Sequence, residues 1–306
     1  MQLGVHLPLV PFGEHPLSLR RLQATVDAAR ECGFAAIAAN DHLVFQTPWL
    51  DGPTALASMV ERSGEMELAT TVSLAVLRGP IPLAKALVAL DVLSEGRLVA
   101  AVGPGSSERD YRLLGIPFEE RWKRLDEALT VLRPLLSVGD AELAPGPRRA
   151  GGIPLWIGSW GSRAGLARVA RAGDGWLASA YNTTPQRFAA ARGALPAGFP
   201  NALATMWTWV TEDRAEGERV LADVLAPMLR RDPDELRAQV CVGPAEHCAE
   251  LLSRYAEAGC ERVYLWPLGD EGRQVSRVAE TVAPFLRISS AGSSTGARHS
   301  SRRLRA

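Results

Sequence analysis

The sequence has no excess of charge of either sign, because 34 lysines and arginines balance 34 aspartates and glutamates. Proteins that bind nucleic acids normally present a basic face, so this balance argues against DNA or RNA as a partner. No apolar run is long enough to span a bilayer, which argues against a membrane protein. The first residues, MQLGVHL, lack the basic and apolar regions of a signal peptide and resemble a strand. We therefore expect a cytoplasmic protein.

The four cysteines, Cys32, Cys241, Cys248 and Cys260, lack the CxxC spacing of metal and redox motifs. All four fall in predicted helices or at their ends. We therefore expect free, buried thiols and no metal site.

One strand–helix–strand unit is marked with unusual clarity. Residues 68–76 are rich in Thr and Val, as in a strand covered on both faces. Pro80 then begins a helix that Gly96 ends, and residues 97–102 form a second buried strand. This strand leads into the loop 103–107, which is rich in small residues and lies at the carboxyl end of the strand. Parallel α/β folds place their chemistry at that end.

Strand and helix signals alternate along most of the chain. The expected strands are residues 3–10, 34–39, 68–76, 97–102, 153–158, 175–180, 203–211 and 262–266. The expected helices are residues 18–31, 54–62, 80–95, 118–136 and 162–171, one after Thr184, and residues 213–231, 244–259 and 273–287, with Ser18 and Thr54 as N-caps. This pattern predicts an α/β fold, a (β/α)8 TIM barrel, in one domain of residues 1–287. Residues 288–306 contain four arginines and no acidic residue, so we expect a disordered basic tail.

A doubly wound dinucleotide-binding sheet is the competing fold. Its fingerprint needs Gly or Ala three residues after the second glycine, but Gly105 is followed by Glu108 at that place. The match therefore fails, and the barrel is favoured.

Residues 83–115, LAKALVALDVLSEGRLVAAVGPGSSERDYRLLG, resemble the signature segment of the bacterial luciferase-like monooxygenase superfamily of flavin and deazaflavin enzymes. Three more segments agree with it in the expected order: NDH at 40–42, PLWIGSWGS at 154–162 and AGDGW at 172–176. The resemblance implies a luciferase-like barrel with a flavin, or the deazaflavin coenzyme F420, in the mouth at the carboxyl ends of the strands. It also implies a non-prolyl cis peptide bond near Thr71 and Val72, in a bulge of the third strand.

The resemblance implies a set of cofactor-binding residues after the third, fourth and fifth strands. They are Thr71, Val72, Gly103, Gly105, Ser106, Ser107, Gly158, Ser159, Trp160, Gly161 and Ser162. The phosphate is expected at Ser159, Trp160 and Gly161, because the N–H groups that begin the next helix form an anion site. Ser162 could equally cap that helix, and the two roles are compatible.

His42 is the catalytic residue that the resemblance implies, since relatives place a histidine beside the reactive ring. Histidine exchanges protons near neutral pH, which suits proton transfer to a substrate oxygen while hydride moves. On its own, a histidine at a strand end is more often a hydrogen-bonded loop residue. Asp41 is expected to orient loops.

Tryptophans and arginines near the strand ends are further candidates. Trp49, Trp160, Trp209 and Trp266 could form the wall of an apolar substrate pocket or could pack in the core. Arg78 and Arg109 could face cofactor anions or could form surface ion pairs.

We predict an oxidoreductase that transfers hydride between F420 and a small organic substrate. An FMN-dependent monooxygenase of the same fold is the alternative, and a non-catalytic ligand-binding barrel is the third possibility. Ser106 stands where F420-dependent sugar-phosphate dehydrogenases have Glu, so glucose 6-phosphate is not the expected substrate. The bias towards Ala, Arg, Gly and Leu resembles actinobacterial proteins, which favours F420. The resemblance also implies a homodimer that assembles through barrel helices.

Overall fold

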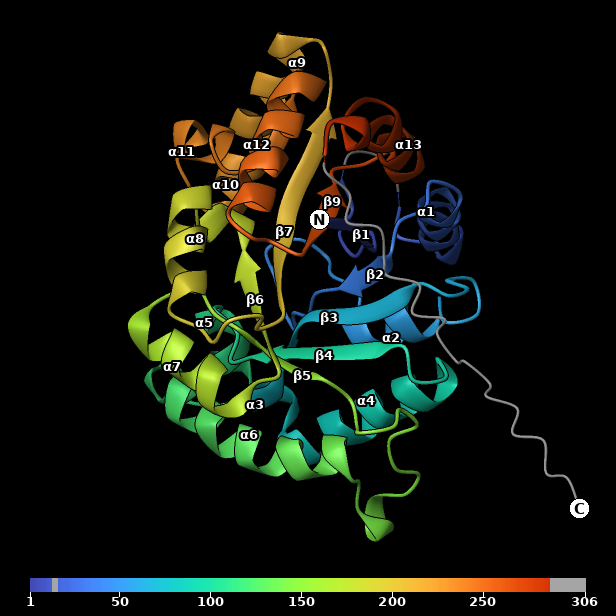
Figure 1. The fold of residues 1–306 in the computed structure, drawn as a ribbon, viewed down its shortest axis with the longest axis vertical. Coiled ribbons are helices and arrows are strands. Elements are labelled where there is room, and N and C mark those ends of the chain that lie inside the picture. The colour runs from blue at the N-terminus through green and yellow to red at the C-terminus, as the bar shows by residue number, and fades with distance from the viewer. Residues whose placement is uncertain (13–15, 287–306) are drawn as a thin grey trace, which may run out of the picture.

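The computed structural model describes residues 1–12 and 16–286, and shows a closed barrel of eight parallel strands (Figure 1). The barrel strands are β1 (Gln2–His6), β2 (Ala36–Ala39), β3 (Glu67–Leu74), β4 (Leu98–Gly103), β5 (Leu155–Gly158), β6 (Gly175–Ser179), β7 (Asn201–Val210) and β9 (Arg262–Pro267). Each strand pairs with the next, and β9 pairs with β1 to close the circle. The predicted (β/α)8 barrel is confirmed.

The strands alternate between small side chains inside the barrel and large ones outside it. Ala36 and Ala38 of β2 point into an inner cluster of alanines that also contains Tyr264, whereas Ile37 joins the outer core beneath the helices. Gly4 is required here, because a Cβ atom at this position would lie 2.6 Å from the Tyr264 ring. The narrow interior is therefore filled by packed side chains, and open space is left only at the mouth.

Helices surround the barrel (Figure 1). They are α1 (Leu19–Glu31), α2 (Gly52–Ala57), α3 (Ala75–Arg78), α4 (Pro80–Leu93), α5 (Glu108–Leu113), α6 (Arg121–Ser137), α7 (Arg163–Ala172), α8 (Pro185–Gly193), α9 (Arg214–Arg219), α10 (Ala226–Leu229), α11 (Pro233–Arg237), α12 (Ala245–Glu257) and α13 (Glu271–Thr281). The first and last of these lie side by side, and Arg21 Nε donates a hydrogen bond of 3.0 Å to Glu271. This ion pair ties the two ends of the described chain together.

Several predicted boundaries are wrong. The cap of α2 is Asp51, whose carboxylate accepts from the Thr54 N–H at 2.9 Å, so Thr54 lies inside the helix. The helix predicted at 213–231 is interrupted by a π-helical segment, Val220–Leu225, between α9 and α10. A short strand, β8 (Cys241–Gly243), was missed; it pairs with the end of β7, outside the circle of eight. Cys241 therefore lies in a strand and not in a helix.

Other predictions agree with the structure. Ser18 and Ser162 cap α1 and α7, and all four cysteines are free, although Cys32 is only half-buried. The peptide bond between Thr71 and Val72 is cis, as predicted, and the pairing of β3 with β4 shifts between Thr71 and Ser73. Among residues 1–12 and 16–286, no helix is both long and apolar enough to cross a membrane. The predicted basic tail, 288–306, lies outside the described residues.

Candidate active site

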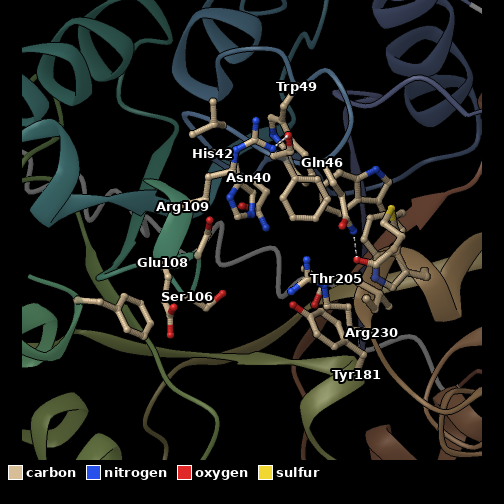
Figure 2. Close-up of a pocket in the computed structure, with 18 of the residues that line it drawn as sticks. Asn40, His42, Gln46, Trp49, Ser106, Glu108, Arg109, Tyr181, Thr205 and Arg230 are labelled. Carbon is tan, nitrogen blue, oxygen red and sulfur yellow. Dashed lines mark hydrogen bonds between the residues drawn. The ribbon is translucent and has the colours of Figure 1, made fainter. Parts of the chain in front are cut away.

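Two cavities open side by side at the carboxyl ends of the strands. The larger has a volume of about 590 Å³ and the smaller about 310 Å³, both within the range of small-molecule sites. They share six lining residues, which are Asn40, His42, Ser106, Phe118, Tyr181 and Thr205. The side chain of His42 therefore stands at the junction between two adjoining spaces (Figure 2).

The smaller cavity gathers all but two of the predicted cofactor-binding residues. Those that line it are Thr71, Val72, Gly103, Gly105, Ser106, Gly158, Ser159, Trp160 and Ser162. Ser107 lines only the larger cavity, where its side chain caps α5. Gly161 lies in a separate surface hollow between α7 and α8, with φ of +88°, a conformation that favours glycine. Ser107 and Gly161 therefore fix the conformation of their loops and do not line the smaller cavity.

Two of the predicted glycines make room for a protein side chain. A Cβ atom on Gly103 would lie 2.9 Å from Val72, and one on Gly158 would lie 2.8 Å from it. The bulge in β3 directs Val72 across β4 and β5, and only glycine at both positions accepts it. Val72, Leu177, Ala178 and Ala204 also line the smaller cavity, which gives it an apolar surface suited to a flat ring.

One end of the smaller cavity is suited to an anion. The helix α7 begins there, with Ser159 and Ser162 in the lining, and the N–H groups of a helix N-terminus attract negative charge. The guanidinium of Arg121 lines the same cavity and lies 4.0 Å from the centre of the Phe118 ring. Arg121 donates to the Phe118 carbonyl at 3.0 Å and makes no ion pair with any described residue, so no carboxylate of the described ranges neutralises its charge. Sequence reasoning missed Arg121, which is one of several arginines on α6.

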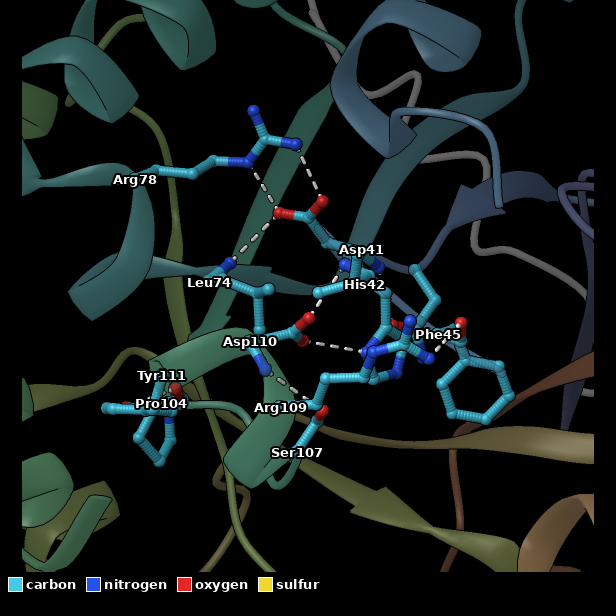
Figure 3. A network of polar contacts seen from close by, with 12 residues as sticks. Asp41, His42, Phe45, Leu74, Arg78, Pro104, Ser107, Arg109, Asp110 and Tyr111 are labelled. Carbon is cyan, nitrogen blue, oxygen red and sulfur yellow. Dashed lines mark hydrogen bonds and ion pairs between the residues drawn. The ribbon is translucent and has the colours of Figure 1, made fainter. Parts of the chain in front are cut away.

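His42 is held by a carboxylate from a different loop (Figure 3). Its Nδ1 lies 3.1 Å from Oδ2 of Asp110, which is buried, and the other carboxylate oxygen accepts from the Val44 N–H at 2.7 Å. A carboxylate accepts hydrogen bonds, so the contact places a hydrogen on Nδ1, and in the neutral ring Nε2 is the nitrogen with the free lone pair. Nε2 makes no hydrogen bond within the described part of the chain. The arrangement leaves a basic nitrogen at the junction of the two cavities.

Asp41 forms the adjacent part of this network. Its buried carboxylate accepts from the Leu74 N–H at 3.1 Å and from Arg78 at 2.6 Å, so it joins the loop after β2 to the end of β3 (Figure 3). These hydrogen bonds raise the pKa of Arg78, which also pairs with Asp51. Asp41 thus orients loops, as expected. Arg78 lines neither cavity, so the ion-pair alternative holds for it.

Aromatic rings form one side of the larger cavity. Trp266 stacks on Trp207 at 4.3 Å between ring centres, and Trp49 meets Trp266 edge-on at 5.6 Å. Of the four predicted tryptophans, Trp49 and Trp266 line this cavity and Trp160 lines the smaller one; Trp209 lines neither. His42 packs against Trp49 and Phe45, which extends the aromatic surface up to its ring.

A second histidine lies beneath the cavities. His6, at the end of β1, is fully buried and stacks on Trp266 at 4.3 Å. Its Nε2 accepts from the Thr205 N–H at 3.4 Å, and Thr71 Oγ1 lies 3.4 Å from its Nδ1. Burial lowers the pKa of His6 from 6.5 to about 3, so its ring is neutral at physiological pH. It supports three residues that line the cavities, and it does not itself reach them.

Comparison with known proteins identifies the family. The model of the luciferase-like monooxygenase family matches residues 1–202, which is most of the barrel. The chain belongs to the luciferase-like monooxygenase family. It is 29% identical over 229 residues to the 4-hydroxyprotoasukamycin monooxygenase of Streptomyces nodosus subsp. asukaensis, a match that covers 70% of this chain and 59% of that relative.

Solved structures show the same fold. The monooxygenase RslO1 from Streptomyces bottropensis superposes with a TM-score of 0.78 at 20% identity, over 93% of this chain and 99% of that one. An F420-dependent secondary alcohol dehydrogenase in complex with an F420-acetone adduct gives 0.73 at 16% identity, over 94% and 99%. These likenesses show that the chain shares the barrel fold of these enzymes.

Several residues of this luciferase-like site escaped sequence reasoning. Asp110, Tyr181 and Thr205 come from the segments after β4, after β6 and within β7. The spacing Ser107-x-x-Asp110 predicts a helix start but not a contact with His42, which lies 68 residues earlier. Desolvation raises the pKa of Tyr181, so its hydroxyl stays protonated and can donate a hydrogen bond at the junction.

Proposed function

We propose that this chain is an F420-dependent oxidoreductase that transfers hydride between the coenzyme and a small organic substrate. The observation that carries the proposal is the pair of adjoining cavities that meet at His42. The smaller cavity would hold the coenzyme and the larger would hold the substrate. The two ligands would then meet at His42, which we propose as the catalytic base.

The residues of the smaller cavity fit such a coenzyme. Val72 and Leu177 present apolar surface to a flat ring system, and the start of α7 with Arg121 presents positive potential to a phosphate. When bound, the coenzyme supplies the two-electron chemistry as a hydride donor or acceptor. The cofactor-binding residues that the resemblance implied would contact the coenzyme directly, with the exception of Ser107 and Gly161.

The chain's own residues would manage the proton. His42 Nε2 would remove a proton from a substrate hydroxyl, or return one to a carbonyl, as hydride moves at the adjacent carbon. Asp110 would keep Nδ1 protonated and would stabilise the imidazolium when it forms. Trp49 and Phe45 would exclude water from that side of the histidine.

An FMN-dependent monooxygenase is the second candidate, because the matching family and the similar Streptomyces enzyme are both described as monooxygenases. Nothing in the apolar and phosphate-binding parts of the smaller cavity distinguishes FMN from F420. A cytoplasmic location and a homodimer belong to the same proposal. Light scattering at micromolar concentration that gives the monomer mass would contradict the dimer.

Titration of the purified protein with F420 and with FMN tests the function directly. We expect F420 to quench tryptophan fluorescence, since Trp122 and Trp160 line the smaller cavity. We expect Arg121→Gln to weaken F420 binding at least about tenfold through loss of a charged phosphate contact. Arg124→Gln is the matched control, because Arg124 lies one turn further along α6 and pairs with Glu120.

The outcomes distinguish an F420-dependent oxidoreductase, an FMN-dependent monooxygenase and a non-catalytic ligand-binding barrel. Binding of FMN alone would favour the monooxygenase. Binding of neither cofactor would reject both enzymes and favour a barrel that only binds another ligand. Equal F420 affinity for Arg121→Gln and wild type would show that the phosphate lies elsewhere.

A further inference from the structure

The larger cavity has two chemically different sides. One is aromatic and consists of four rings in successive contact. Phe45 meets Trp49 edge-on at 4.9 Å, Trp49 meets Trp266 edge-on at 5.6 Å, and Trp266 stacks on Trp207 at 4.3 Å. Flat faces of this size favour a flat, unsaturated ligand, because aromatic rings stack or meet edge-to-face with other π systems. The aromatic side reaches His42, where the reaction of our proposal takes place.

The other side is positively charged. Arg109, Arg112 and Arg230 line the cavity and are exposed at its rim, and Glu108 is the one described carboxylate in that lining. Three positive charges and one negative charge leave a net charge of +2. Arg109 and Arg230 reach the cavity from different elements, the first from α5 and the second from the turn that ends α10 (Figure 2).

The three rim arginines are not neutralised by neighbouring carboxylates. Some surface arginines do pair with carboxylates, as Arg62 does with Asp27 and Arg237 with Glu218. By contrast, none of the three rim arginines forms an ion pair with a residue of the described ranges, and Arg109 donates only to the Phe45 carbonyl, at 3.2 Å. A mouth with three uncompensated guanidinium groups attracts anions.

We infer that the substrate is a flat aromatic or conjugated molecule that carries a carboxylate or similar anionic group. Its ring would lie along Trp49 and Trp266, and its anionic group would lie at the rim between the arginines. The group that reacts would then point towards His42. This inference rests on the proposed function, because it assumes that the larger cavity is the substrate side.

The anionic groups of the cofactor are a competing explanation for the arginines. The smaller cavity already offers a separate anion site at the start of α7 with Arg121, and none of the three rim arginines lines it. The two positive regions therefore lie at different cavities, and we assign one to each ligand.

A pair of probes of equal shape tests the inference: naphthalene-2-carboxylate and naphthalene-2-carboxamide. Calorimetric titration of the full-length protein, with and without a saturating cofactor, should give at least about tenfold tighter binding of the carboxylate at low salt. The triple variant Arg109→Gln, Arg112→Gln, Arg230→Gln should bring the two affinities together and leave that of the carboxamide unchanged. Arg20→Gln, an exposed arginine on α1, should keep the preference.

Variant Trp49→Leu should weaken both probes by a similar factor, since it removes stacking surface and no charge. Equal affinities in the wild-type protein, or no binding of either probe, would overturn the inference. A triple variant that loses affinity for the cofactor but still prefers the carboxylate probe would also overturn the inference. Because the probes are also titrated without cofactor, failure of F420 and FMN to bind would reject the proposed function and leave this result intact.

Discussion

Two histidines at the ends of neighbouring strands, His6 after β1 and His42 after β2, meet opposite surroundings. His6 is enclosed by Trp266, Thr71 and Thr205, and burial lowers its pKa to about 3 because it disfavours the charged ring. His42 is partly exposed and holds Asp110 with one nitrogen, which leaves the other nitrogen at the cavity junction. Burial therefore makes one imidazole a structural part of the site, and a carboxylate partner orients the other, to which we assign proton transfer in our proposal.

The largest effect that this comparison predicts is on catalysis. His42→Ala should lose about 10²–10⁴ in kcat while it binds F420 almost normally, since a positioned acid or base contributes that much. The measurement is single-turnover reduction of bound cofactor by a panel of candidate donors. His6→Ala is the contrasting variant and should lose mainly stability, by about 2–5 kcal/mol, because it leaves a cavity in the stacked core.

A His42 variant with wild-type single-turnover rates would break the comparison. The histidine would then be a loop residue, and the hydride proposal would rest on the cofactor cavity alone.

A smaller effect should follow when the partner of His42 is changed. Asp110→Asn keeps the shape but has only one acceptor oxygen, which cannot serve both the Val44 N–H and the His42 ring. We expect a loss of roughly 10–10² in kcat, with a shifted pH–rate profile and little change in KM. Glu119→Gln, which removes an exposed carboxylate that lines neither cavity, should leave that pH profile in place. Identical pH profiles for Asp110→Asn and wild type would show that Asp110 only joins two loops.

The smallest effect is the pH dependence of stability that His6 causes. In the unfolded chain His6 takes up a proton below about pH 6.5, whereas in the folded protein it stays neutral down to about pH 3. The unfolded state thus binds more protons in this window, so stability falls as pH falls, by at most about 1.4 kcal/mol per pH unit from this group. Denaturant unfolding of wild type and His6→Gln between pH 4 and 7 measures it. We expect a shallower slope for the variant, and equal slopes would mean that His6 is charged in the folded state.

Sequence patterns were sufficient for the fold and for most of the smaller cavity. The alternation of strands and helices predicted parallel strands with both faces buried, and the eight-fold count together with the failed dinucleotide fingerprint favoured a barrel over a doubly wound sheet. The resemblance to the luciferase-like family implied that Val72, Gly103 and Gly158 belong to one site, and all three line the smaller cavity because parallel strands bring the ends of β3, β4 and β5 to one mouth. The boundaries failed where local signals compete: Asp51 and Thr54 are both good caps, and the structure uses the first.

What the sequence determined by itself is therefore the order of the elements and the loops that face the mouth, because hydrophobic period, prolines and glycines act over short distances. Only the tertiary structure decided which side chains meet across those loops. Asp110 reaches His42 across 68 residues, and Arg121 of α6 lines the same cavity as Ser162, the cap of α7. The division of the mouth into two cavities that meet at His42 has the same origin, since it depends on how side chains from the strands β2–β7 and β9 and the loops after them fill one shared space.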